Sequence, residues 1–258
     1  KVIEFQTKNA QWEKTYGLEV AKLQNTKEKE EFDRKLALWK EGLGPNPISP
    51  IGGGYQGAVL SPTGDVHFIP ATQSTAVGQK ISVVGTVSTY SLVYTTGAGY
   101  NGAALAPNGD IHFVPSNARV GQKISATGTV STYSLAYTTS NAYQGGVLSA
   151  NGDIHFVPNS ATVGQKISAA GTVSTYSLAY TAGQAYFGGV LAPNGDIHFV
   201  PYAARVGQKV SANGVASTYS LTYSPAGVNA YAGGVLNSAG DIHFIPFSAT
   251  VGQKVSSA

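Results

Sequence analysis

The residues of this chain best suited to chemistry are an aspartate and a histidine that recur together five times. The phrase Gly-Asp-(Ile/Val)-His-Phe places each aspartate two residues before its histidine. In a β-strand, positions i and i+2 lie on the same face, so a carboxylate and an imidazole could act together in acid–base chemistry or metal binding. The five pairs are Asp65/His67, Asp110/His112, Asp153/His155, Asp196/His198 and Asp241/His243.

The pattern favours a structural role for these pairs. One carboxylate and one imidazole are too few ligands for a metal site. Hydrolysis of a glycosidic bond needs carboxylates in unlike environments, whereas the five aspartates occupy one equivalent turn position. Buried polar groups are normally paired, so we expect each histidine to be buried, to bond to Asp or to Ser/Thr and to fix the strand register. The sequence therefore predicts no catalytic residue, no metal, no cofactor and no enzymatic activity.

The spacing of the histidines indicates the architecture. Consecutive histidines are separated by 45, 43, 43 and 45 residues. A repeat of this period is one structural unit that needs its neighbours to bury its faces. In the third unit, turn signals divide the chain into β-prone segments at 143–149, 153–157, 164–169 and 173–181. Four antiparallel strands per unit predict an all-β fold, a five-bladed β-propeller over residues 51–258.

Glycines support this interpretation at two places. Asn151-Gly152 predicts a tight primed turn between the first two strands, because such turns need positive φ angles. Paired glycines in the first strand indicate that the innermost strands of adjacent blades approach closely at the axis. We expect the repeated lysine of Val-Gly-Gln-Lys to be a solvated strand-end charge, and the repeated tyrosines to fill the wedges between blades.

The fifth unit ends at Ala258 without its fourth strand. Three explanations remain open: an N-terminal strand at residues 2–7 completes the blade, the blade stays three-stranded, or the chain has lost its end. Residues 2–7 alternate apolar and polar side chains, which favours the first explanation.

The first 44 residues differ from the rest and are predicted to form an amphipathic α-helical anchor. Residues 45–50 are a Pro-rich linker. The apolar stripe of this helix could pack on the propeller itself or dock on another subunit, and two tryptophans on a tethered helix favour docking. The expected anchor residues are Trp12, Tyr16, Val20, Leu23, Phe32, Leu36 and Trp39.

Composition excludes several classes of partner. The net charge is only +3 and the chain holds no Lys/Arg cluster, so we expect no binding to nucleic acid or to anionic membranes. The absence of cysteine excludes disulfides and thiolate metal sites. No apolar run approaches the roughly 18 residues of a membrane-spanning helix.

Two sets of loops vary between the otherwise similar units: the loop after each second strand and the loop that joins one unit to the next. In a propeller both sets emerge on one face, where ligands usually bind. Tyr and Arg are common contact anchors, and Tyr with Asn suits a sugar, although variation without function would give the same pattern. The candidate ligand-binding residues are Asn117, Arg119, Asn159, Tyr202, Arg205 and Phe247.

The phrase GGVLAPNGDIHFVP at 188–201, closely followed at 145–158, resembles a propeller-forming repeat family of bacterial, protist and viral proteins. A repeat set joined to a charged helical segment also resembles structural proteins of tailed phages, such as fibres, collar appendages and capsid decorations. These resemblances imply a virion protein that binds other virion subunits through its N-terminal helix and has a propeller for spacing or for host-surface glycans. The alternative is a free extracellular lectin with equivalent sugar pockets between its blades.

Overall fold

The computed structural model describes residues 54–71, 77–95, 98–223 and 229–256, together with the helical and exposed Glu30 and Asp33. The chain divides into two compact units, residues 1–49 and residues 50–258. The predicted anchor residues, the linker at 45–50 and the possible strand at 2–7 all lie outside the described residues. The fold below is that of the second unit.

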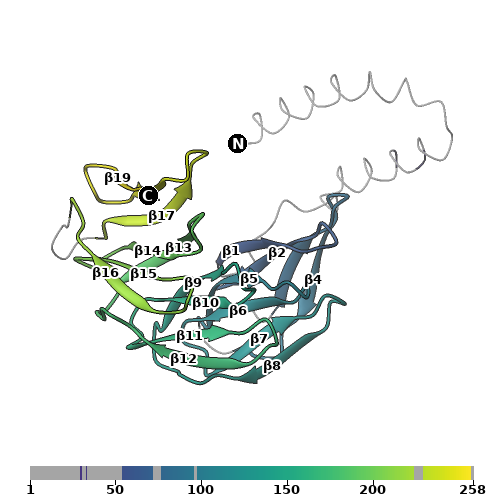
Figure 1. Cartoon of the computed structure of the whole chain (residues 1–258). Coiled ribbons are helices and arrows are strands. Elements are labelled where there is room, and N and C mark those ends of the chain that lie inside the picture. Colours follow the sequence, from purple (N-terminus) through teal and green to yellow (C-terminus); the bar gives the residue numbers. More distant parts are fainter. Residues whose placement is uncertain are drawn as a thin grey trace. The chain divides into compact units, whose positions relative to one another are not determined.

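The described part of this unit is all-β and consists of five antiparallel sheets in chain order, which we call blades 1 to 5 (Figure 1). Blade 1 holds β1 (Tyr55–Leu60), β2 (Val66–Pro70), β3 (Val77–Ile81) and β4 (Val87–Ser91). Blade 2 holds β5 (Tyr100–Leu105), β6 (Ile111–Pro115), β7 (Val120–Ile124) and β8 (Val130–Ser134). Blade 3 holds β9 (Tyr143–Leu148), β10 (Ile154–Pro158), β11 (Val163–Ile167) and β12 (Val173–Ser177). Blade 4 holds β13 (Tyr186–Leu191), β14 (Ile197–Pro201), β15 (Gly207–Val210) and β16 (Ala216–Tyr219). Blade 5 holds β17 (Tyr231–Leu236), β18 (Ile242–Pro246) and β19 (Gln253–Val255).

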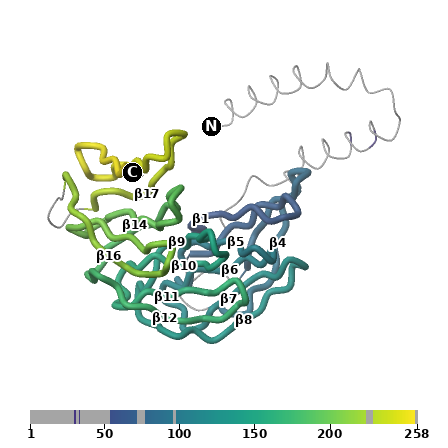
Figure 2. The backbone as a smooth tube through the Cα atoms, in the orientation of Figure 1, coloured from purple at the N-terminus to yellow at the C-terminus, as the bar shows by residue number. Residues whose placement is uncertain are grey.

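Within each blade the strands follow one another as neighbours, in the order predicted from the turn signals. The first strands of consecutive blades also lie side by side, so that β1, β5, β9, β13 and β17 form the inner part of the array (Figure 2). The prediction of an all-β, propeller-like repeat of four-stranded antiparallel sheets is confirmed. The fifth sheet has three strands among the described residues.

Glycine allows the inner strands to lie this close together. Gly145 has a φ of +83°, and a Cβ added there would lie 3.2 Å from the Cα of Gly188 in the next blade. The same relation holds between Gly57 and Gly102, at 3.2 Å. Both the positive φ and the short contact disfavour a side chain, so the predicted close approach of the inner strands is confirmed.

The hydrophobic core lies between blades rather than within one blade. Tyr143, Ile154 and Phe156 of blade 3 are fully buried and pack against Ala104 and Val114 of blade 2. Burial of a large apolar side chain contributes about 1.5–3 kcal/mol, and equivalent residues repeat this cluster at the other described junctions. Each blade therefore supplies the apolar surface that its neighbour needs.

The predicted fourth strand is too long by several residues. In blade 3 the sheet ends at Ser177, and residues 178–180 cross to the next blade, where the N–H of Tyr180 donates to Oε1 of Gln208 at 2.7 Å. At the preceding junction, Gln165 Oε1 accepts the N–H groups of Ala136 and Tyr137 at 2.9 and 2.7 Å. In the sequence, the segment after Ser177 looks like a continuation of the strand, but in the structure it links two blades. We call residues 178–180 the inter-blade clamp.

The prediction of a primed turn at Asn151-Gly152 is wrong. Only the glycine is left-handed, with a φ of +86°, and Asn151 is not among the described residues with positive φ. Two backbone hydrogen bonds close the loop: the N–H of Gly152 donates to Ser149 O at 3.0 Å, and the N–H of Ser149 donates to Asp153 O at 2.8 Å. Asn151 serves through its side chain instead, since its Oδ1 accepts the N–H of Asp153 at 3.1 Å.

Candidate functional site

The repeated aspartate connects two turns of its own blade. In blade 3, Asp153 Oδ2 lies 2.6 Å from Lys166 Nζ, and its Oδ1 accepts the N–H of Ala169 at 3.2 Å. The same ion pair occurs in all five blades. The repeated lysine stays partly exposed, as predicted, but the prediction missed its ion pair, which forms because the aspartate directly precedes the strand next to the lysine's strand.

In blades 2, 3 and 4 the repeated histidine bonds to a tyrosine. His155 is buried, and its Nδ1 lies 3.2 Å from Tyr176 Oη, with the two rings 5.3 Å apart. His112 and His198 make the same contact with Tyr133 and Tyr219. These three imidazoles are buried and paired, but the partner is neither Asp nor Ser/Thr, because the tyrosine of the fourth strand extends across the third strand to reach them.

His243 of blade 5 departs from this arrangement. It is exposed, and its Nε2 lies 3.2 Å from Nδ2 of Asn237 in its own hairpin. The expectation of a buried histidine that fixes the strand register is therefore wrong for His243. The physical reason is that the described sheet of blade 5 has three strands, so no fourth-strand tyrosine covers this imidazole there.

His67 of blade 1 is intermediate between these two cases. It is buried beside Tyr90, and the centroids of the two rings lie 5.5 Å apart. Its Nδ1, however, has no hydrogen-bond partner among the described residues. The histidine and tyrosine of blade 1 are thus packed together without the hydrogen bond seen in blades 2, 3 and 4.

In blades 2, 3 and 4, neither the repeated histidine nor the repeated aspartate titrates near neutral pH. Burial, and then the positive charge of Lys166, lower the pKa of His155 to about 4. Burial is the largest single influence on Asp153 and opposes its ionisation, but the hydrogen bonds from Lys166 and Ala169 and the positive charge of Lys166 together outweigh burial and lower the pKa of the carboxyl group. Among the residues that the structure describes, no three His, Cys, Asp or Glu side chains gather where they could hold a metal ion.

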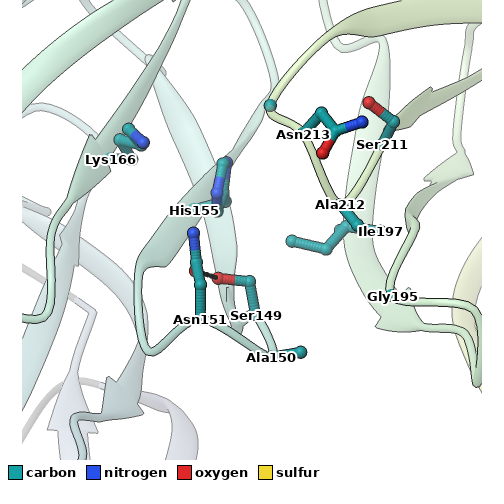
Figure 3. Close-up of a pocket in the computed structure, with 11 residues that line it drawn as sticks. Ser149, Ala150, Asn151, His155, Lys166, Gly195, Ile197, Ser211, Ala212 and Asn213 are labelled. Carbon is teal, nitrogen blue, oxygen red and sulfur yellow. Dashed lines mark hydrogen bonds between the residues drawn. The ribbon is translucent and has the colours of Figure 1, made fainter.

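Pockets lie between consecutive blades at the level of these residues. One of them, with a volume of about 360 Å³, lies between blade 3 and blade 4 (Figure 3). Blade 3 contributes Ser149, Asn151 and His155, and blade 4 contributes Ser211 and Asn213. Equivalent pockets of about 230 and 180 Å³ lie between blades 1 and 2 and between blades 2 and 3.

A second kind of cavity lies at the axis, where the inner strands meet. Its volume is about 340 Å³, and its walls include the residue that follows the first tyrosine of each unit. Asn101 donates from Nδ2 to Ser116 Oγ at 3.2 Å and to Gln144 Oε1 at 3.5 Å, so the amides are partly connected. The five wall residues are Gln56, Asn101, Gln144, Phe187 and Ala232.

An aromatic strip continues from this cavity across blades 4 and 5. The rings of Phe187 and Tyr202 lie 5.3 Å apart, and those of Tyr202 and Phe247 lie 6.1 Å apart. Phe247 is 65% exposed. The structure therefore brings together two of the predicted ligand-binding residues, Tyr202 and Phe247. Phe187 was not predicted, although its departure from the Gln/Asn of blades 1 to 3 was visible in the repeat.

The other predicted ligand-binding residues lie elsewhere. Asn117 and Arg119 line a separate pocket of about 220 Å³ with Thr138, Thr139 and Ser140. Asn117 is also structural, because its Oδ1 accepts the N–H of Asn141 at 2.9 Å. Asn159 is buried and donates to Tyr186 O at 3.2 Å, and Arg205 is exposed.

No protein-family model matches this chain, and no curated protein sequence matches it. Among solved structures, a catalytically inactive virginiamycin B lyase from Staphylococcus aureus with quinupristin is similar, with a TM-score of 0.67 and 19% identity over 81% of this chain and 71% of that one. A putative gluconolactonase is similar over 75% of this chain and 72% of that one, with a TM-score of 0.55 and 14% identity. An auxiliary nutrient binding protein from Bacteroides ovatus matches over 79% of this chain and 55% of that one, with a TM-score of 0.54 and 15% identity.

These likenesses show the fold and correct one prediction. The chain was predicted not to be an enzyme, and this is contradicted because a lyase and a putative gluconolactonase share its fold. The exclusion considered only the repeated acids, whereas a propeller can carry a catalytic site on residues that are not repeated. The likenesses support the propeller part of the family resemblance, and the phage part remains a prediction. Among the described residues, no helix has the length and apolar character to cross a membrane.

Proposed function

We propose that this chain binds a neutral carbohydrate at the axial cavity and the aromatic strip beside it. In this proposal the propeller array has five blades, and the ligand lies on the face that carries the variable loops. The observation that supports the site best is the position of Phe187, which is both a wall of the cavity and the first ring of the strip.

The chemistry of the cavity fits a neutral ligand with many hydroxyl groups. Its described lining consists of glutamine, asparagine, glycine, alanine and phenylalanine residues and includes no ionisable side chain. Amides donate and accept hydrogen bonds, as sugar hydroxyls require, and an aromatic ring covers the apolar face of a pyranose. The volume of about 340 Å³ falls in the usual range for small-ligand pockets.

The aromatic residues are departures from the repeat, and this argues for a role beyond folding. The position of Phe187 holds Gln56, Asn101 and Gln144 in blades 1 to 3, so the fold tolerates an amide there. The position of Tyr202 holds Ser116 and Asn159 in blades 2 and 3. Phe187 and Tyr202 are half-buried, and partly accessible rings that the fold does not need are typical of binding surfaces.

The test compares the wild type with Phe187→Gln, which installs the residue found in blades 1 and 3. A glycan array identifies ligands, and calorimetry measures their affinity; we expect the variant to bind at least about tenfold more weakly. Thr175→Ala, on an exposed position of β12, is the matched control and should bind like the wild type. Equal binding by Phe187→Gln, or no glycan bound by the wild type, contradicts the proposal.

The same incubations also test for turnover, because enzymes share the fold. If a bound sugar is converted to product and Phe187→Gln abolishes conversion, the site is catalytic as well as binding. If conversion persists in this variant, the chemistry takes place at another site.

Attachment to a larger assembly through residues 1–44, such as a phage virion, remains part of the proposal, with the free lectin as its alternative. The sequence pattern of the anchor supports attachment. Sizing of the full chain and of a chain that begins at residue 45 distinguishes the two. An assembly that requires residues 1–44 supports attachment, and a full chain that stays single favours the free lectin.

A further inference from the structure

The pocket between blades 3 and 4 differs from its two counterparts in ways that the repeat does not require. All three pockets are lined by the first hairpin of one blade and by the turn after the third strand of the next. Their volumes are about 360, 230 and 180 Å³, and the largest is the one between blades 3 and 4. Since the backbone turns are equivalent, side chains must account for the difference.

The first departure is Ala150. Blades 1 and 2 have Pro62 and Pro107 at this turn position, and each ring lies against a glycine of the following blade. A Cβ added at Gly109 would lie 3.3 Å from Pro62 Cγ, and one at Gly152 would lie 3.2 Å from Pro107 Cγ. A Cβ at the equivalent Gly195 would meet only Ala212 of its own blade. Replacement of proline by Ala150 therefore opens the entrance of this pocket.

The second departure is Asn213, on the opposite wall. The equivalent residues are Val84, Thr127 and Ala170, so only this pocket has an amide at that position. Figure 3 shows Asn213 and Ser211 across the pocket from Ser149, Asn151 and His155. Both departures from the repeat thus lie at the junction of blades 3 and 4. Ala150 is smaller than the proline in the hairpins of blades 1 and 2, and Asn213 adds a hydrogen-bond donor and an acceptor.

The charges of the pocket are already balanced. Lys166 points its ammonium group at Asp153, 2.6 Å away, so it does not present an unpaired charge to the cavity. Burial keeps His155 neutral at physiological pH, since its pKa is lowered to about 4. Ile197 supplies an apolar wall. The other polar side chains of the lining are hydroxyls and amides, which suit a neutral ligand with several hydroxyls.

We propose that the pocket between blades 3 and 4 is a second binding site, for a neutral polyhydroxylated molecule of monosaccharide size. The volume of about 360 Å³ accommodates one such molecule. Amide and hydroxyl groups from both blades hold the ligand, which therefore bridges the junction. This site is separate from the axial cavity and does not depend on the function proposed for it.

The test uses the proline that the chain itself has at this position. Ala150→Pro restores the residue of blades 1 and 2 and should narrow the entrance without harm to the turn. Saturation-transfer NMR and calorimetry with glucose, galactose, mannose and their N-acetylated amines measure binding to the full chain. All measurements use the Phe187→Gln background, in which binding at the axial cavity is weakened.

We expect a panel sugar to bind in this background and both Ala150→Pro and Asn213→Ala to weaken it at least about tenfold. Pro107→Ala, which opens the smaller pocket between blades 2 and 3, should not weaken binding, and an additional weak site there would support the proposal further. The proposal is overturned if no panel sugar binds in the Phe187→Gln background, or if Ala150→Pro binds as well as its parent. A melting temperature that stays the same or rises in Ala150→Pro separates lost binding from lost folding.

Discussion

At the residue scale, the buried histidines couple the stability of the fold to pH. Burial lowers the pKa of His112, His155 and His198 to about 4, from an ordinary value of 6.5. Between these two values the unfolded chain binds protons that the folded chain does not, so protons favour unfolding. The stability that these histidines contribute is therefore fully present above about pH 6.5 and is lost as the pH falls towards 4.

A shift of this size corresponds to roughly 3 kcal/mol for each histidine. Urea unfolding at pH 7.5 and pH 5 measures the loss. In His155→Gln, which can still bond to Tyr176, the loss between the two pH values should shrink measurably, because one of the four histidines whose pKa is lowered by burial is removed. Thr175→Ala, at an exposed position that does not titrate, is the control and should leave the loss unchanged. If His155→Gln loses as much stability between pH 7.5 and pH 5 as the wild type does, the buried histidines do not cause the pH dependence.

Gly164 is a second residue on which a blade depends. It pairs with Tyr176 across β11 and β12, and the tyrosine ring lies directly over it to reach His155. A Cβ added at Gly164 would come within 2.2 Å of the ring, closer than any real contact. We expect Gly164→Ala to destabilise the fold by about 1–3 kcal/mol, as overpacked cores do. Gly183→Ala is the control, since its Cβ would have no neighbour within 4 Å; equal melting temperatures for the two variants would contradict this account.

At the scale of the element, the sequence predicted what is periodic and failed where an element depends on a contact with another. Strand number, strand order and the glycine contacts at the axis follow from alternation, turn residues and spacing. The tyrosine partner of His155 lies 21 residues away, and the clamp at residues 178–180 looks like a continued strand. His243 belongs to an identical phrase, yet it is exposed because burial depends on a fourth strand rather than on the phrase itself.

The candidate site was predicted in part, for the same reason. Tyr202 and Phe247 were found because their positions vary between units. Their contact with each other and with Phe187 depends on how blades 4 and 5 pack, which no local pattern expresses.

The first hairpin of blade 3 carries a prediction of its own. Ala150 stands where three other blades have proline, and a proline there restricts the unfolded chain without cost to a turn that accepts it. We expect Ala150→Pro to stabilise the fold by about 0.4–1 kcal/mol, measured by urea unfolding. Pro107→Ala should destabilise it by a similar amount. A loss of stability in Ala150→Pro would mean that the turn of blade 3 differs from those of blades 1 and 2.

At the scale of the whole propeller unit, its first and last blades each present a face that is covered elsewhere in the array. On blade 5, Val235 and Ile245 are 55% and 50% exposed, whereas the equivalent Val147 and Val157 of blade 3 are buried at 8% and 0%. On blade 1, Phe68 is only half-buried. Gln79 Oε1 is buried without a partner among the described residues, although the equivalent Gln165 accepts two N–H groups from the preceding blade.

The two faces have the residue types that already pack together at each internal junction, so we expect copies of this chain to associate head to tail. The contact is heterologous, because it joins different surfaces of the two partners. The size of the assemblies should therefore increase with protein concentration. Sedimentation velocity over a range of concentrations measures it. Ile245→Glu should remain a single chain, because it places a charge on the exposed apolar face of blade 5. Val215→Glu, at an exposed turn of blade 4, is the control and should associate like the wild type. A wild type that stays single at every concentration would show that these faces do not pair between copies.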